Sequence, residues 1–235
     1  MSTQTEQQVG ECYEKVRSRI AQAAQRRGAA ADGITLVAVT KYASDEQIDA
    51  LLATGHRDLG ENRVQQLQQR ARALPDDVRW HMIGHLQRNK VKHVLPLVTM
   101  IHSVDSARLA KAIDQRAEHD GVVADVLLQV NISGEQRKFG AESEAAVPLA
   151  GQMSAMPHLR LRGVMTMAPY SDNPEDARPV FAACRKLYDQ LRDQLDEDGR
   201  AGFDTLSMGM TGDFEVAIEE GANVVRIGSA IFGGS

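Results

Sequence analysis

Two kinds of apolar pattern alternate along the chain. Short, nearly unbroken apolar runs are typical of strands buried on both faces of a parallel sheet, and apolar residues spaced three or four apart are typical of helices with one buried stripe. We predict strands over residues 34–41, 57–61, 79–84, 99–104, 124–131, 159–167, 203–209 and 223–228. We predict helices over residues 4–27, 44–55, 62–74, 87–95, 106–119, 142–156 and 213–220, and a long helix that begins just before Pro179.

The order of these elements predicts the fold class. Regular alternation of strands and helices implies parallel strands joined by right-handed crossovers. Eight such strands within 235 residues favour an α/β fold of the (β/α)8 TIM-barrel type over the alternative, an open doubly wound sheet. We expect a single domain over residues 1–235, in which residues 1–28 form an additional N-terminal helix that packs on the barrel.

Composition narrows the class of protein. The chain is 43% hydrophobic, carries a formal net charge of −5 and shows no basic patch, which argues against a nucleic-acid partner. The polar N-terminus and the lack of a long apolar run argue against a signal peptide and a membrane partner. Cys12 and Cys184 lie far apart in the sequence, which favours a reduced, cytoplasmic setting over a disulfide framework.

Two segments near the C-terminus predict an anion site. Ser207-Met208-Gly209-Met210-Thr211-Gly212-Asp213 and Val224-Val225-Arg226-Ile227-Gly228-Ser229 are apolar runs that stop at glycine and a hydroxyl residue. We expect Thr211 to cap the helix that follows it, and a helix N-terminus binds phosphate through unpaired N–H groups. In a (β/α)8 barrel, phosphate commonly binds after strands seven and eight, which is where these segments fall. Two ordinary strand-to-helix turns are the alternative.

Lys41 ends the first apolar strand and is therefore expected at the same mouth of the barrel. Desolvation and nearby positive charge would lower the pKa of its amine and make it a nucleophile. A reactive lysine beside a phosphate site indicates either a sugar-phosphate aldolase or a protein that holds pyridoxal 5′-phosphate (PLP) as a Schiff base.

Arg226 helps to separate these two hypotheses. It shares a side of its strand with Gly228 and faces either the barrel interior or the helices. A permanent cation facing the pyridine nitrogen of PLP would keep that nitrogen unprotonated and disfavour transamination. The alternative is an arginine paired with an acid beneath the barrel mouth. His81, His85 and His93 lack a common face and an adjacent carboxylate, so we predict no metal site.

Six segments in sequence order carry a resemblance to a known family: Ala38-Val39-Thr40-Lys41, Gly60-Glu61-Asn62-Arg63-Val64-Gln65, Trp80-His81-Met82-Ile83-Gly84-His85-Leu86-Gln87-Arg88-Asn89-Lys90, Val130-Asn131-Ile132-Ser133, Ser207-Met208-Gly209-Met210-Thr211 and Val225-Arg226-Ile227-Gly228-Ser229-Ala230-Ile231-Phe232-Gly233. Together they resemble the PLP homeostasis protein family (the YggS/PROSC type), from about residue 34 to the end.

The resemblance implies a fold-type III barrel like the N-terminal domain of alanine racemase, with PLP linked to Lys41. It implies that Arg226 faces the pyridine nitrogen and that Asn62 lies beside the ring. It also implies a phosphate pocket, built largely from backbone N–H groups and lined by Ser207, Met210, Thr211, Gly228 and Ser229.

The chain departs from the family pattern at several positions. His85 stands where proline is common, Thr211 where serine is common, and Tyr42-Ala43-Ser44 where a second lysine and a proline are common. Thr211 keeps the hydroxyl group, so we expect phosphate binding to survive. Lys138 matches a loop lysine of the family. One interpretation is that Lys138 holds PLP secondarily or relays it, and the alternative is a solvated loop lysine.

The choice between enzyme and carrier depends on a second acid/base group. Racemases of this fold take a tyrosine from an additional β-domain, which we expect to be absent because the sequence stops at Ser235, soon after the eighth strand. We therefore favour a protein that buffers or delivers PLP without robust turnover, with amino acids, 2-oxo acids and apo forms of PLP-dependent enzymes as candidate partners. The alternative is an amino-acid racemase that uses Lys41 and Tyr42 as opposing bases.

Overall fold

The structure is a computed structural model that describes residues 3–135 and 139–233. Eight parallel strands of the described chain close into a barrel, because β1 pairs with both β2 and β9 and β4 pairs with β5. The barrel strands are β1 (Thr35–Val39), β2 (Asp58–Glu61), β3 (Arg79–Met82), β4 (Met100–Val104), β5 (Ala124–Asn131), β7 (Leu159–Met165), β8 (Thr205–Ser207) and β9 (Val224–Ile227). The short strand β6 (Ala141–Glu142) pairs in parallel with the end of β5.

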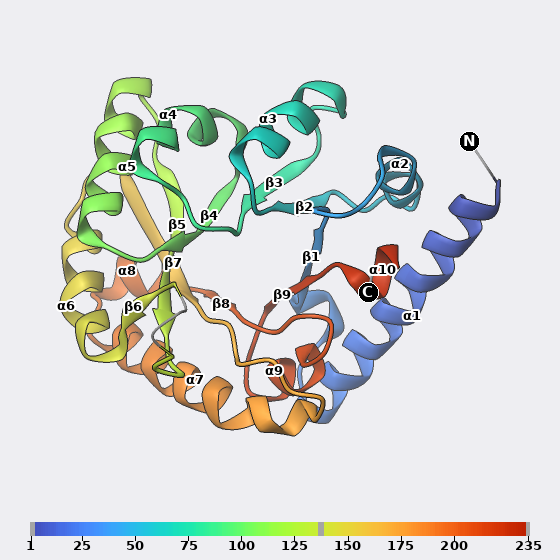
Figure 1. Ribbon diagram of the computed structural model, residues 1–235. Coiled ribbons are helices and arrows are strands. Elements are labelled where there is room, and N and C mark those ends of the chain that lie inside the picture. Colours follow the sequence, from blue (N-terminus) through green and yellow to red (C-terminus); the bar gives the residue numbers. More distant parts are fainter. Residues whose placement is uncertain (1–2, 136–138, 234–235) are drawn as a thin grey trace.

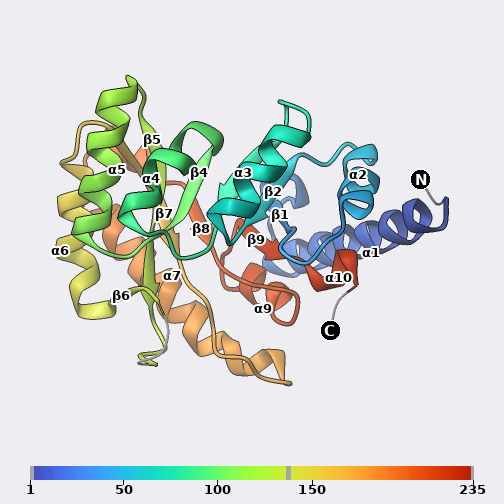
Figure 2. The same cartoon turned by 45° about the horizontal axis from the view of Figure 1, so that its top comes forward.

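Helices surround this barrel on its outer side (Figure 1, Figure 2). The α-helices are α1 (Thr3–Arg27), α2 (Asp45–Ala53), α3 (Val64–Ala73), α4 (Val91–Val94), α5 (Ala107–Asp120), α6 (Ser143–Ser154), α7 (Arg178–Asp193), α8 (Glu197–Gly202), α9 (Phe214–Glu219) and α10 (Ser229–Phe232). In both views α5 and α6 lie on one side of the barrel and α1, α2 and α10 on the other, while α7 runs along the bottom between them. The predicted closed barrel with an N-terminal helix is therefore confirmed, and the open sheet is wrong.

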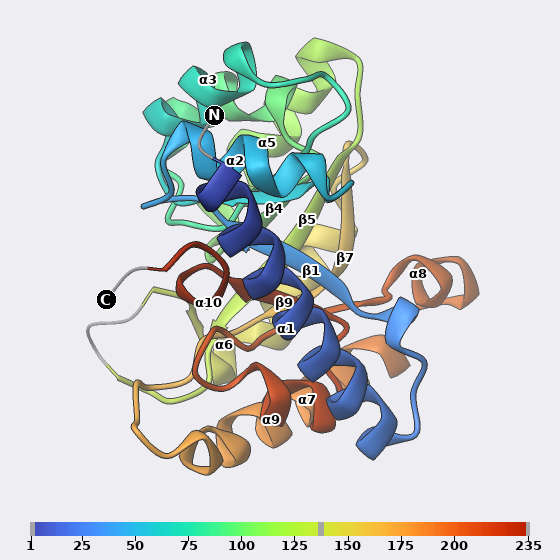
Figure 3. The ribbon, with the colours of Figure 1, turned by 90° about the vertical axis from the view of Figure 1, so that its right-hand side faces the viewer.

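The N-terminal helix α1 runs along the outside of the barrel (Figure 3) and contacts α2, α9 and α10. Its predicted apolar stripe is buried, and Val16 and Ile20 are almost inaccessible to solvent. Ion pairs flank the stripe, with Arg19 bonded to Glu215 and Arg26 to Glu219 of α9. Because α9 follows β8 in the chain, the helix supports the same side of the barrel that carries the two C-terminal segments.

Several predicted boundaries are confirmed and others are wrong. The capping box at Ser44 forms, with Gln47 as its partner, and α7 begins one residue before Pro179. The single helix predicted over 87–95 is instead a 3₁₀ turn (Arg88–Lys90), α4 and a second 3₁₀ turn (Leu95–Leu97). Pro96 lacks an N–H and its ring clashes with the preceding helical turn, so α4 stops after one turn. The short helices α8 and α10 were not predicted.

Charged residues ring the N-terminal ends of the strands, which we call the lower mouth of the barrel. Its ion pairs join Asp58 to Arg79, and Arg162 to both Asp125 and Asp204. They border a hollow of about 410 Å³ that also reaches the His81 side chain. The predicted site is expected at the opposite opening of the barrel, at the C-terminal strand ends, which we call the upper mouth.

Gly163 marks an irregularity in β7. The pairing of β5 with β7 shifts register between Val126 and Leu127, as at a β-bulge. Gly163 has a φ of +152°, and a Cβ at this position would lie 1.7 Å from the carbonyl oxygen of Thr205. Only glycine therefore lets β7 approach β8 this closely on the way to the upper mouth.

Candidate functional site

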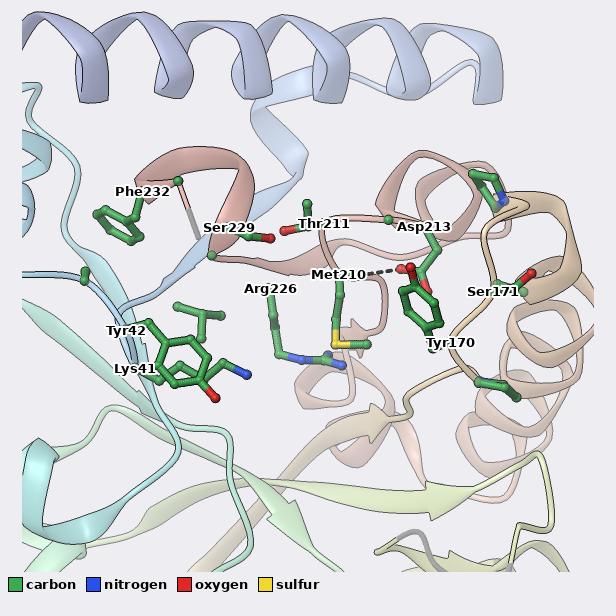
Figure 4. A pocket seen from close by; sticks show the side chains of 18 of the residues that line it. Lys41, Tyr42, Tyr170, Ser171, Met210, Thr211, Asp213, Arg226, Ser229 and Phe232 are labelled. Carbon is green, nitrogen blue, oxygen red and sulfur yellow. Dashed lines mark hydrogen bonds between the residues drawn. The ribbon is translucent and has the colours of Figure 1, made fainter. Parts of the chain in front are cut away.

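A cavity of about 350 Å³ opens at the C-terminal ends of β1, β8 and β9 (Figure 4). Six of the eight site residues predicted from the sequence line it: Lys41, Met210, Thr211, Arg226, Gly228 and Ser229. Tyr42, Tyr170 and Asp213 line it as well. The structure therefore brings the amine at the end of the first strand to the same cavity as the two C-terminal segments.

Asn62 and Ser207 are the two predicted residues that do not line the cavity. Asn62 follows β2, and its backbone packs against Gly84, where an added Cβ would lie 2.3 Å from the Asn62 carbonyl oxygen. Ser207 is fully buried below the cavity and accepts a hydrogen bond from Arg226. Lys138 lies outside the described residues.

Lys41 and Arg226 enter the cavity from different strands, and in Figure 4 the lysine side chain extends toward the guanidinium group. The Lys41 side chain is exposed, so the desolvation expected from the sequence is absent. Its Nζ lies 4.9 Å from the centroid of the Tyr42 ring, which is itself 82% exposed. The amine is thus open to a ligand that enters the cavity from solvent.

The loop that carries Lys41 is held from below by α3. Buried Arg70 donates hydrogen bonds to the carbonyl oxygens of Thr40 (2.6 Å) and Ala43 (2.7 Å). Gln66, one turn earlier on the helix, donates to the carbonyl oxygen of Lys41 itself (3.1 Å). Three carbonyl groups of the loop, those of Thr40, Lys41 and Ala43, are therefore held by one helix, which limits how far the lysine can move.

A buried carboxylate completes this support. Glu61, at the end of β2, pairs with Arg70 and accepts a hydrogen bond from the Thr40 hydroxyl. These contacts engage one carboxylate oxygen, and the other, Oε2, is buried without a hydrogen-bond partner among the described residues. The sequence patterns above include Glu61 only within a family segment, and they give Arg70 and Gln66 no role.

The two C-terminal segments form a notch at the far side of the cavity. The hydroxyl groups of Thr211 and Ser229 point toward one another in Figure 4. The sequence predicted that Thr211 caps α9, and this prediction is wrong. The helix begins at Phe214, and the residue before it is Asp213. The Asp213 carboxylate instead accepts a hydrogen bond from the Met210 backbone N–H (2.6 Å), and this contact fixes the turn. Thr211 is thereby left facing the cavity.

Arg226 points into the barrel interior and is 4% exposed. It donates to Ser207 Oγ (2.6 Å) and to the carbonyl oxygen of Thr166 (2.9 Å). Burial lowers its pKa to about 10, although the Asp213 charge opposes the shift, so it stays cationic at neutral pH. Among the described residues no carboxylate forms an ion pair with it, unlike the acid-paired arginine that the sequence left open.

Two buried histidines predict how stability depends on pH. Burial lowers the pKa of His56, and burial together with the Arg226 charge lowers the pKa of His102 well below 6.5. The unfolded chain binds protons at these groups below about pH 6.5 and the folded chain does not, so acid favours unfolding. We expect the free energy of unfolding to fall as the pH drops below about 6.5, with at most about 1.4 kcal/mol per pH unit from each histidine.

Urea unfolding at several pH values measures this slope. His102→Gln should show a shallower slope than the unaltered chain, because it removes one of the two groups. His93→Gln is the matched control, since His93 is exposed and should leave the slope unchanged. An unaltered slope in His102→Gln would contradict the assignment.

The sequence is similar to those of known proteins along most of its length. Residues 14–235 match the sequence model described as alanine racemase, N-terminal domain. The chain is 43% identical over 220 residues to the pyridoxal phosphate homeostasis protein of Aquifex aeolicus, which covers 93% of this chain and 95% of the relative.

Solved structures show the same fold along most of the chain. An unknown protein from Bifidobacterium adolescentis has a TM-score of 0.92 at 34% identity, covering 99% of this chain and 97% of that one. PipY of Synechococcus elongatus, with PLP bound, has a TM-score of 0.77 at 32% identity, covering 91% of this chain and 100% of that one.

The fold and the site thus define a barrel of the alanine racemase N-terminal type. Within that class, the chain belongs to the pyridoxal phosphate homeostasis protein family. The family predicted from the six sequence segments is therefore confirmed.

No helix within residues 3–135 and 139–233 is long and apolar enough to cross a membrane. Over the same residues, no group of three or more histidine, cysteine, aspartate or glutamate side chains is placed to hold a metal ion.

Proposed function

We propose that the chain binds PLP in the cavity at the upper mouth, linked to Lys41 as a Schiff base, and buffers or delivers the cofactor without robust catalytic turnover. The observation that carries this proposal is the convergence of the Lys41 amine, the Arg226 cation and the Thr211–Ser229 notch on one cavity of about 350 Å³. The PLP-bound structure of PipY, a relative at 32% identity, supports the choice of ligand.

Each part of the cavity fits one part of the cofactor. The hydroxyl groups of Thr211 and Ser229, with the backbone N–H groups around Gly228, would hold the phosphate, since helix N-termini leave such donors unpaired. Arg226 would face the pyridine nitrogen, and Met210 would pack against the ring. Asn62 and Ser207 would act from just outside the cavity. When bound, PLP supplies an aldehyde that exchanges between a lysine and free amines.

Within residues 3–135 and 139–233, the Arg226 guanidinium donates to two neutral acceptors and forms no ion pair with a carboxylate. Its positive charge therefore remains available to the cavity, where it would keep a pyridine nitrogen unprotonated. An unprotonated ring is a poor electron sink, which suits a protein that holds the cofactor and does not turn it over.

The tyrosines at the cavity also argue for a carrier. The Tyr42 ring lies beside the Lys41 amine and not across the cavity from it. Tyr170 is 91% exposed, and its hydroxyl donates to Asp172 (3.0 Å), a hydrogen bond that raises its pKa. Proton transfer on two opposite faces of a substrate would need a base that neither side chain provides in this position.

Domain organisation, location and exchange partners are also part of the proposal. We infer one domain over residues 1–235, with α1 as a helix packed on the barrel, and a cytoplasmic location in which Cys12 and Cys184 stay reduced. Both thiols are unpaired in the described chain. Free amino acids or 2-oxo acids, and apo forms of PLP-dependent enzymes, are the proposed partners in cofactor exchange.

Reduction with borohydride tests the attachment site. We expect PLP to give the purified chain a visible absorption band that borohydride abolishes, and peptide mapping to find the reduced label on Lys41. Lys41→Gln should lose the covalent label, whereas Lys92→Gln, which alters an exposed lysine away from the cavity, should keep it. Label on Lys138 or on any other lysine of the unaltered chain would overturn the assignment.

Incubation with single enantiomers separates carrier from racemase. We expect the PLP-loaded chain to leave enantiomerically pure amino acids unconverted, as measured by chiral chromatography. Steady accumulation of the other enantiomer that disappears in Tyr42→Phe would establish the racemase alternative instead.

A further inference from the structure

A chain of hydrogen-bonded side chains crosses the barrel from the lower mouth to Arg226. His81 Nε2 lies 3.3 Å from Asp58 Oδ1, and His81 Nδ1 lies 2.9 Å from His102 Nε2. His102 Nδ1 lies 3.0 Å from Ser207 Oγ, which accepts from Arg226. The links come from β2, β3, β4, β8 and β9, and the three middle residues are at most 7% exposed.

The two ends of this chain allow only one direction of donation when both histidines are neutral. A guanidinium group has only donors and an ionised carboxylate has only acceptors. Burial alone would raise the pKa of Asp58, but hydrogen bonds from His81 and Arg79 outweigh it and hold the pKa low, so the carboxylate is ionised.

Ser207 therefore receives a hydrogen from Arg226 and gives its own to Nδ1 of His102. His102 carries its hydrogen on Nε2 and donates to Nδ1 of His81, which in turn donates from Nε2 to Asp58. The ends of the chain thus fix the tautomers of both imidazole rings.

We propose that His81, His102 and Ser207 are positioning residues for Arg226, and that their one-directional hydrogen bonds anchor its guanidinium to Asp58 across the barrel. The anchor is relayed through neutral groups, so it orients the guanidinium without placing a carboxylate beside it. Its effect on PLP rests on the proposed function, in which Arg226 faces the pyridine nitrogen.

Protonation shows why the order of the chain matters. His81 contacts Asp58 from β2, which pairs with Arg79, and His102 from β4. The hollow that His81 borders is also lined by Asp125, Arg162 and Asp204. A second proton on His81 would make its Nδ1 a donor, so His102 would have to accept at Nε2 and donate from Nδ1 to Ser207. Ser207 would then receive two donors, and its own hydroxyl hydrogen would lose its acceptor in the barrel interior.

Nitrogen-15 NMR of the histidine side chains tests the chain without any PLP. At about pH 7.5 we expect the His81 and His102 rings each to carry a single hydrogen, on Nε2, because the two ends of the chain allow only this order of donors and acceptors. A His102 ring with hydrogen on Nδ1, or a cationic ring at either position, would overturn the proposal.

Substitutions test whether the chain positions Arg226. Ser207→Ala removes a hydrogen bond from the charged Arg226 donor and should speed exchange of the Arg226 guanidinium protons with water roughly tenfold. His102→Leu leaves that bond in place but removes the acceptor of the Ser207 hydroxyl, so it should speed the same exchange by a smaller factor. His102→Gln keeps one acceptor and one donor and should restore slow exchange. Ser207→Ala, a small change, serves where His102→Leu fails to fold.

His56→Gln is the matched control. His56 is also buried, but it hydrogen-bonds to the backbone carbonyl of Asp58 and is not part of the series of hydrogen bonds that reaches Arg226. It should leave the Arg226 protons unchanged. Equal acceleration in His56→Gln and His102→Leu would mean general loosening of the barrel, and it would overturn the positioning role.

The two proposals fail in different ways. In PLP-loaded protein, His102→Leu should shift the pH dependence of the visible spectrum while borohydride still labels Lys41. An unshifted spectrum with normal labelling would sink the positioning role alone. If both histidines carry hydrogen on Nε2 and the Arg226 guanidinium protons exchange slowly, but the protein takes up no PLP, only the proposed function would be overturned.

Discussion

Arg70→Met is expected to lower the free energy of unfolding by about 3–5 kcal/mol, because it leaves the Glu61 carboxylate buried without its cation. Glu61 is fully buried and pairs with Arg70, whose side chain is only 9% exposed. The same arginine also donates to the carbonyl oxygens of Thr40 and Ala43, so the loop that carries Lys41 loses its support. We therefore expect weaker labelling of Lys41 by PLP and borohydride, as well as lower stability in urea.

Two further variants make this prediction specific. Arg72→Met changes an exposed arginine on the same helix and should cost little. Adding Glu61→Gln to Arg70→Met removes the stranded charge and should recover a large part of the lost stability. If the single variant were as stable as the unaltered chain, the buried pair would not be a support of the loop.

Sequence patterns were sufficient for the barrel because most strands are short and apolar, as in β1 and β5, and most are followed by a helix with one apolar stripe. The position of Lys41 at the upper mouth follows from the same argument, since parallel strands end on one side. The role of Arg70 could have been predicted, because Arg70 falls on the buried stripe of α3 beside Leu67. An arginine on an apolar stripe predicts a buried partner.

Other features depend on contacts between segments far apart in the sequence. Ser207 ends β8 and was assigned to the phosphate pocket, yet its side chain faces the barrel interior, where Arg226 and His102 occupy it. Thr211 resembles an N-cap, but the Asp213 carboxylate fixes the turn by accepting from the Met210 N–H. Local patterns rank candidate caps, whereas the geometry of the turn decides between them.

Arg226→Glu is expected to lower the free energy of unfolding by at least about 3 kcal/mol near neutral pH, because it buries an unpaired carboxylate. The new side chain would meet the Thr166 carbonyl oxygen, which accepts but cannot donate, and the nearby charge of Asp213. Both effects raise the pKa of the new carboxyl group above its unfolded value of about 4.3.

The pH dependence of this penalty has a definite sign. A raised folded pKa means that the folded chain holds a proton that the unfolded chain releases, so the destabilisation is smallest near about pH 4 and grows as the pH rises. Urea unfolding of Arg226→Glu beside the unaltered chain at each pH measures it. Arg63→Glu, at an exposed arginine, should show almost no penalty at any pH. A penalty that is constant with pH would show that the new carboxyl group is solvated.

Arg226→Gln separates the charge of this residue from its hydrogen bonds. A carboxamide keeps N–H donors for this polar interior, although on a shorter side chain, and it brings no positive charge. We expect this variant to fold, to keep PLP on Lys41 and to bind it with a pyridine nitrogen that protonates at higher pH, seen as a shifted titration of the visible band. An unshifted titration in a variant that still binds PLP would mean that the Arg226 charge does not reach the ring.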